Sequence, residues 1–129
     1  MYTVEKKYNK TTTNWYNNVC YDSCKEAGHA RLLDKKVRDG EILGYEYQYK
    51  IDFFIEMRGG EPVLVANPLA RRNSQFLCRY KVDFKVNNPD GTVDLVEVKG
   101  LQGMEWRMKW TMLESVFGND PMYQLTIIK

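Results

Sequence analysis

Hydrophobic and aromatic residues alternate with polar ones in several segments, which is the period of a β-strand. The clearest case covers residues 45–54, where Tyr45, Tyr47 and Tyr49 lie two positions apart and are followed by Ile51. We expect one strand there, or two. Further strands are predicted at 62–65 after Gly59-Gly60, at 76–86 and 92–98 as a hairpin, and at 123–128 as a buried strand.

Two other segments have the spacing of a helix. Residues 22–39 begin with Ser23-x-x-Glu26, a capping-box pattern, and end before Gly40, which suits the position after a helix. The residues expected to face the core are Ala27, Ala30, Leu33 and Val37. Residues 104–117 form the second predicted helix, with an apolar set at spacings of four, three and four: Trp106, Trp110, Leu113 and Phe117.

Near the N-terminus, residues 11–21 read as a small hairpin that turns at Asn17-Asn18. Residues 1–10 are expected to form a flexible or loosely packed arm, and residues 67–74 a basic loop. The order of elements is then hairpin, helix, strands, hairpin, helix and strand. This order predicts one domain over 1–129, with an α/β (α+β) fold in which helices flank a mixed β-sheet.

Composition narrows the class of protein. Hydrophobic residues make up 43% of the chain, and no apolar run approaches the roughly 18–20 residues that span a bilayer. The first ten residues lack the apolar stretch of a signal peptide, so we expect a cytoplasmic protein that does not enter the membrane. Three cysteines argue against a disulfide framework, and with His29 they match no familiar zinc motif. His29 has no partner motif for catalysis either.

The candidate chemistry lies in the predicted hairpin. Asp83 interrupts a strand pattern, although Asp is depleted from strand interiors, and Glu97 and Lys99 share one face of the next strand. The hairpin would bring Asp83 alongside them. Two carboxylates and an ammonium make a poor core but a good site for a hard divalent cation such as Mg²⁺. Asp94 lies three residues before Glu97, so we expect it to face the other side and to be exposed to solvent.

The stretches "YKVDF" (80–84) and "VEVKG" (96–100) resemble the active-site motif of the PD-(D/E)xK nuclease superfamily, although Val82 stands where a Pro is usual. Upstream, "YDSCKEA" (21–27) resembles the first helix of phage-encoded members, whose Glu points to the metal. "GEI" (40–42), Gln48 within an aromatic strand and Lys109 on the last helix follow in matching order. The chain is thus similar to small phage nucleases and phage Holliday-junction resolvases over residues 8–128.

The resemblance implies a restriction-endonuclease-like fold and a Mg²⁺-dependent DNA endonuclease, with Mn²⁺ able to substitute. Asp83 and Glu97 would hold the metal with the Val98 carbonyl, and Glu26 would join directly or through water. Lys99 would help to activate the attacking water. Basic residues expected to contact DNA phosphates are Arg71, Arg72, Arg107 and Lys109.

The resemblance to phage resolvases favours branched DNA, a homodimer and the cytoplasm of a host cell. Three alternatives stay open at this point. Glu26 can serve only as a helix cap. The chain can be a non-catalytic DNA-binding or recombination accessory protein on the same fold. It can also be a structural protein with a chance motif in its hairpin.

Overall fold

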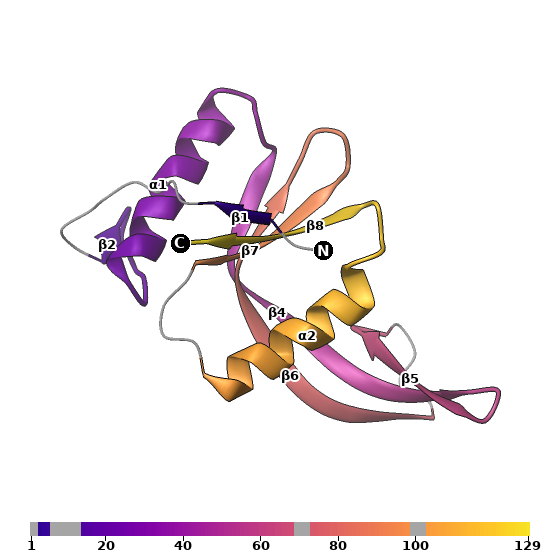
Figure 1. Ribbon diagram of the computed structural model, residues 1–129. Helices are drawn as coiled ribbons and strands as arrows, with labels where there is room; N and C mark the ends of the chain where they lie inside the picture. Colours follow the sequence, from indigo (N-terminus) through magenta and orange to yellow (C-terminus); the bar gives the residue numbers. More distant parts are fainter. Residues whose placement is uncertain (1–2, 6–13, 69–72, 99–102) are drawn as a thin grey trace.

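The computed structural model describes residues 3–5, 14–68, 73–98 and 103–129. Within these ranges a six-stranded mixed sheet runs in the order β1-β8-β7-β6-β4-β5. Its strands are β1 (Thr3–Glu5), β4 (Gly44–Arg58), β5 (Glu61–Ala66), β6 (Ser74–Asn87), β7 (Val93–Val98) and β8 (Tyr123–Ile128). β7 and β8 are parallel and are joined through the helix α2 (Met104–Phe117), whereas β4, β5, β6 and β7 pair antiparallel. The α/β class and the mixed sheet with flanking helices are confirmed (Figure 1).

Local signals in the sequence placed most of these elements correctly. Ser23 caps α1 (Cys24–Arg38) by accepting from the Glu26 N–H at 3.1 Å. Asn17 and Asn18 both have positive φ between β2 (Trp15–Tyr16) and β3 (Val19–Cys20), as a two-residue hairpin turn requires. Gly40 follows the helix with φ +76°. Neither described helix is both long and apolar enough to cross a membrane.

Three expectations need correction. Val37, in the last turn of α1, is exposed rather than in the core. β4 is one strand of 15 residues, several longer at its C-terminal end than the alternating pattern indicated. Thr3–Glu5, within the segment expected as an arm, form β1 and pair in parallel with β8. The other residues of that segment lie outside the described ranges.

Two hydrophobic cores lie on opposite faces of β7. Val96 belongs to the core under α1, with Ala27, Ala30 and other residues, whereas its neighbour Leu95 belongs to the core under α2, with Leu113 and others. Successive side chains of a strand point to opposite faces, so the two helices flank the sheet from both sides. Of the four residues predicted on the apolar face of α2, Trp110 and Leu113 are buried and Trp106 and Phe117 are half-buried against the same core.

The long strands β4 and β6 change faces at one point. In β4, Tyr47 packs with the α1 core, whereas Tyr49, two residues later, packs with the α2 core. Residues two apart normally share a face, so the strand rotates between them. Gln48 lies at this point with φ +54°, and the regular pairing skips from Tyr47–Phe84 to Tyr49–Val82. Figure 1 shows both strands running from beside α1 to the far hairpin with β5.

Tyrosine hydroxyls fasten α1 to the neighbouring strands. Tyr16 and Tyr45 both donate to the Asp34 carboxylate, at 2.6 and 2.8 Å, and Tyr47 donates to Glu26 at 2.7 Å. Burial raises the pKa of Tyr45 and Tyr47, and the bond each makes to a carboxylate raises it further. Both therefore stay protonated at neutral pH and can donate. The position of Glu26 thus depends on β4 as well as on its own helix.

The positive φ of Gln48 predicts an inverted order of substitutions. A β-branched side chain is strained in this conformation, whereas glycine adopts it freely. We expect Gln48→Gly to be more stable than Gln48→Val by about 1–2 kcal/mol. Both variants lose the amide, so the difference isolates the backbone. Urea denaturation measures the free energies of unfolding.

The matched control is Lys50, an exposed residue of the same strand. There the order is the usual one for a strand, with Lys50→Val above Lys50→Gly. If valine is also the better residue at position 48, the rotation of the strand does not depend on the conformation of Gln48.

Candidate active site

Asp83 and Glu97 come together from adjacent strands. β6 and β7 pair with Phe84 opposite Val96, and this register places Asp83 beside Glu97 at the end of the ladder. Asp83 Oδ2 accepts a hydrogen bond from the Val98 N–H at 2.8 Å. The predicted hairpin therefore brings these two carboxylates together, and Val98 contacts one of them through its backbone.

Glu97 is held on one side and unsatisfied on the other. Its Oε2 accepts from the Tyr80 hydroxyl at 2.8 Å and from the Trp106 indole N–H at 2.6 Å. The side chain is buried, and its Oε1 has no hydrogen-bond partner among the described residues. A buried carboxylate oxygen without a partner reduces the stability of the folded state. A proton or a cation bound at Oε1 would offset that cost.

The electrostatics of the pair agree with this geometry. Burial raises the pKa of Asp83 to about 9, with the Glu97 and Glu26 carboxylates adding to the rise. Burial also raises the pKa of Glu97, against the bonds from Tyr80 and Trp106 that favour its charged form. Two carboxyl groups at one buried site resist simultaneous ionisation. Without a cation, the pair retains one proton at neutral pH.

Glu26 reaches the neighbourhood of this pair from α1. It is 8% exposed, and its carboxylate accepts from the Tyr47 hydroxyl and, at 3.4 Å, from the Ser23 hydroxyl. Burial raises its pKa, and the charge on Glu97 adds to this rise. Glu26 is therefore close enough for its charge to raise the pKa of Asp83. The Ser23 cap forms through the Glu26 backbone N–H, and the shortest bond of the Glu26 carboxylate is the one from the Tyr47 hydroxyl at 2.7 Å.

The arrangement suits a hard cation only in part. Within the part of the chain that the structure describes, no three His, Cys, Asp or Glu side chains lie close enough together to hold a metal ion. Asp83 and Glu97 nevertheless bring two carboxylates together, and Glu97 Oε1 has no hydrogen-bond partner among the described residues. Mg²⁺ often takes only one or two protein carboxylates and fills its remaining positions with water or phosphate. Two carboxylates are thus as many protein ligands as Mg²⁺ often takes.

A cleft with a volume of about 510 Å³ opens next to Glu97. Tyr80 and Trp106, its two hydrogen-bond donors, line this cleft, and so do three cations, Arg79, Lys81 and Lys109. Arg79 also pairs with Asp52 at 2.6 Å, and Lys109 with Glu105 at 3.0 Å. The Lys109–Glu105 pair is a single surface contact of the kind that contributes little stability, so Lys109 can exchange its partner for an anion at low cost, whereas Arg79 holds Asp52 through two hydrogen bonds.

The other predicted site residues divide into two groups. Lys99, Arg71 and Arg72 lie outside the described residues. Arg107 is exposed on α2 and is not among the described residues that line the cleft, whereas Lys109 is. Of the described basic residues expected to contact phosphate, Lys109 is thus the one that lines the cleft beside Glu97.

Asp94 was predicted to be exposed on the face opposite Glu97. It does lie on the α1 side, with Val96, but it is half-buried and lines a pocket together with His29. The expectation of full exposure is wrong because α1 and the segment after it overhang this part of β7.

Tyr80 and Trp106 were not predicted as site residues. Tyr80 was read only as part of a motif, and Trp106 only as core. Their side-chain chemistry could have indicated a role, because a buried Tyr hydroxyl or Trp N–H usually has a hydrogen-bond partner. The sequence did not show that both partners are the same carboxylate.

Comparison of the chain with protein-family models, with curated proteins and with solved structures found no match.

The raised pKa of Asp83 predicts how stability depends on pH in metal-free buffer. The unfolded chain releases this proton near the ordinary value of 3.8, whereas the folded protein keeps it up to about 9. The folded state binds more protons in between, so this group's contribution to stability falls as pH rises. We expect the melting temperature of the native protein to fall more steeply between pH 7 and pH 9 than that of Asp83→Asn.

Glu46→Gln removes an exposed carboxylate of β4 and should leave the native slope unchanged. Differential scanning calorimetry in EDTA provides the three curves. Parallel curves for the native protein and Asp83→Asn would show that Asp83 is ionised in the folded state without a cation.

Proposed function

We propose that the protein is a Mg²⁺-dependent nuclease that hydrolyses phosphodiester bonds in DNA. The observation that carries the proposal is the pairing of the half-buried Asp83 with the buried Glu97, whose Oε1 has no partner among the described residues. A protein that required only stability would gain from an apolar residue at either position. The same two residues stand at the acidic positions of the nuclease motif that the sequence resembles.

In this mechanism each described side chain has a separate task. Asp83 and Glu97 would hold Mg²⁺, with the Val98 carbonyl and Glu26 as further oxygen donors. When bound there, Mg²⁺ polarises the phosphate and lowers the pKa of its water. Tyr80 and Trp106 fix one oxygen of Glu97, and the other has no partner among the described residues. The Val98 N–H orients Asp83 in the same way.

The cleft beside Glu97 supports a nucleic-acid backbone as the substrate. Its three cations offer charge to phosphates, and Trp106, which stacks on Trp110, adds an aromatic surface at the same place. Lys99, two residues beyond Glu97, is proposed to orient the attacking water and to offset charge that develops on the phosphate. All of these cationic groups would contact the DNA backbone and none would contact the edges of the bases. We therefore propose that the protein recognises the shape of DNA rather than its sequence.

The preferred form of DNA is part of the proposal. The sequence contains one Asp-Glu-x-Lys set, and one such set cuts one strand. A coordinated cut in both strands of a junction therefore needs two protomers. We propose a homodimer that prefers branched DNA, as in the phage resolvases that the sequence resembles. A panel of linear, nicked, flapped and four-way DNAs tests this preference, and light scattering tests the dimer.

Substitution of the carboxylate pair tests the chemistry. Asp83→Asn and Glu97→Gln keep the shape of each side chain and remove its charge. We expect each to reduce Mg²⁺-dependent cleavage by about a hundredfold or more, since several kcal/mol of transition-state stabilisation is lost. Mn²⁺ should substitute for Mg²⁺, and EDTA should abolish cleavage by the native protein.

Glu46→Gln, the exposed control, should cleave normally. Binding of DNA by the native protein without cleavage under any metal would favour the non-catalytic accessory protein. If the Glu97→Gln variant cleaves DNA as fast as the native protein, the carboxylate pair is not the catalytic site.

Two basic residues of α2 provide a matched test of the cleft. Lys109 lines it, whereas Arg107 is exposed elsewhere on the same helix. We expect Lys109→Gln to weaken DNA binding and to lower the slope of log K against log salt by about 1, as the loss of one phosphate contact requires. Arg107→Gln should change both quantities less. Fluorescence anisotropy over a salt series measures them, and a larger effect at Arg107 would place the DNA on another surface.

A further inference from the structure

The cleft beside Glu97 contains an aromatic surface. Trp106 lines this cleft, which lies between β6 and the first half of α2, and its side chain is half-buried rather than covered. The indole stacks on the ring of Trp110, which is 3% exposed, with centroids 5.7 Å apart and an interplanar angle of 14°. The part of the Trp106 indole that Trp110 does not cover is thus available to a flat molecule in the cleft.

The same indole is fixed to the carboxylate pair. Its N–H donates to Glu97 Oε2 at 2.6 Å, and Glu97 lies beside Asp83. This hydrogen bond and the stack on Trp110 hold the ring in one orientation, so a ligand does not have to order it on binding. A molecule that stacks on Trp106 therefore lies one side chain away from the carboxylates of the proposed nuclease site.

The other walls of the cleft suit a nucleotide. Lys81 and Lys109 line it together with Trp106. The carbon chains of lysines can cover apolar surface, whereas their ammonium groups are available to phosphates. The volume of about 510 Å³ is in the range of pockets that hold small molecules. Every nucleobase has a π-face that can stack on an aromatic side chain, so this surface accepts a base of any identity.

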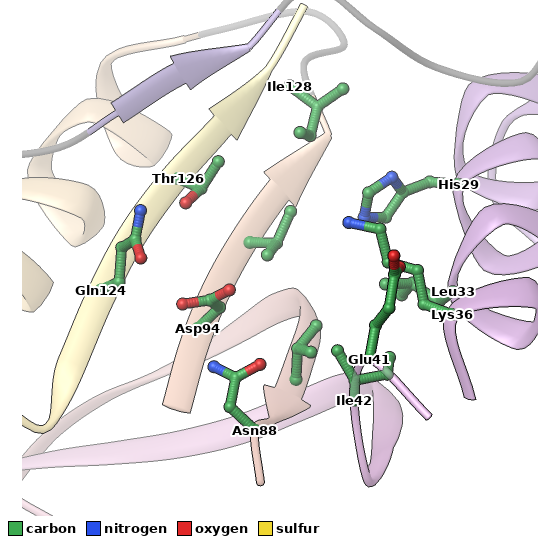
Figure 2. Close-up of a pocket in the computed structure, with 12 residues that line it drawn as sticks. His29, Leu33, Lys36, Glu41, Ile42, Asn88, Asp94, Gln124, Thr126 and Ile128 are labelled. Atoms are coloured by element: carbon green, nitrogen blue, oxygen red, sulfur yellow. The ribbon is translucent and has the colours of Figure 1, made fainter. Parts of the chain in front are cut away.

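Another pocket of the protein lacks such a surface. It lies between α1 and the sheet, and Figure 2 shows residues that line it, among them His29, Leu33 and Thr126. No Phe, Tyr or Trp is among the described residues of its wall, and its volume is smaller, at about 240 Å³. The cleft is therefore the better place for a base, and the imidazole of His29 provides a control.

We propose that the cleft binds one unpaired nucleotide, with its base stacked on Trp106 and its phosphates beside Lys81 and Lys109. A base within a duplex is covered on both faces by its neighbours, so only an unpaired or extruded base reaches the indole. This inference rests on the proposed nuclease and specifies its substrate, which is DNA with an unpaired nucleotide next to the phosphate that is cut. Flaps and open branch points offer such nucleotides, whereas linear duplex DNA does not.

Two strands with the same number of phosphates test the stacked base. Octathymidylate and an abasic strand of the same length, both labelled with fluorescein, are titrated in EDTA so that neither is cut. The native protein should bind octathymidylate at least about fivefold more tightly, as the stacking of one base predicts. Fluorescence anisotropy measures both dissociation constants at one salt concentration, because phosphate contacts depend on salt.

Substitutions at Trp106 locate the base. Trp106→Leu should bind the two strands with the same affinity, and its affinity for the abasic strand should equal that of the native protein. Trp106→Phe keeps an aromatic face and lacks the N–H that Glu97 accepts, so it should keep a preference for octathymidylate. If Trp106→Leu binds neither strand because it does not fold, Trp106→Phe decides, and equal affinities in that variant would overturn the inference.

Two control variants remove aromatic rings elsewhere. Trp15→Leu changes a tryptophan of β2 that is 60% exposed, and His29→Leu changes the imidazole of the pocket in Figure 2. Both should bind the two strands as the native protein does. A preference that is lost in His29→Leu but kept in Trp106→Leu would place the base in the other pocket and contradict the assignment to the cleft.

The results separate this inference from the nuclease. Equal affinity of the native protein for the two strands, or no binding of either, would overturn the stacked base, while Mg²⁺-dependent cleavage of linear duplex DNA would still support the nuclease. A preference that depends on Trp106, without cleavage under any metal, would support the stacked base and contradict the nuclease. If both hold, cuts in a duplex with one unpaired thymidine should map next to that nucleotide, and cuts only at paired positions would overturn the proposed substrate.

Discussion

The rotation of β4 and β6 at Gln48 is the constraint on which the rest of the structure depends. Before this point the strands contribute Tyr47 and Phe84 to the core under α1, and beyond it they contribute Tyr49 and Val82 to the core under α2. Without the rotation, one face of each long strand would meet a single helix along its whole length. Because of the rotation, two helices on opposite sides of the sheet each obtain an apolar surface from the same pair of strands.

The same point in the sheet locates the carboxylates. Asp83 occupies the position of β6 where the regular pairing is interrupted, between residues that belong to different cores. It therefore responds both to Glu26 on α1 and to Glu97, which is bonded to Trp106 on α2. A change of face in a sheet is a place where a polar side chain can be largely buried without entering either core. The fold therefore places these carboxylates at the boundary between its two cores.

Two departures from good packing mark the two faces of β7. On one face, Glu97 has a buried oxygen beside a second carboxylate, and on the other, His29 has two buried nitrogens, none of which finds a hydrogen-bond partner within the described part of the chain. Each arrangement reduces stability, and each could be replaced by an apolar residue at lower cost. Buried polar groups that a fold retains against its own stability are reasonable places to look for function. The proposed nuclease rests on the first of these observations, and the stacked base rests on the indole surface that Trp106 presents to the cleft, so cleavage and base preference can fail separately.

Sequence alone determined the elements with strong local signals. The Ser23 cap, the Asn17-Asn18 turn and the bounds of α2 and β8 follow from hydrogen-bonding and steric preferences within a few residues. The pairing of Asp83 with Glu97 was also predictable, since a hairpin of known turn position fixes which residues lie opposite each other.

Tertiary structure alone decided the features that join distant segments. Nothing local in the chain indicates that Tyr80 and Trp106 bind the same oxygen of Glu97, because they lie in a strand and a helix whose approach depends on the whole α2 core. The alternation of β7 also placed Asp94 in solvent, since the overhang of α1 that half-buries it is not a local property. Alternation and capping act over a few residues, whereas burial and shared partners depend on how complete helices and strands pack against each other.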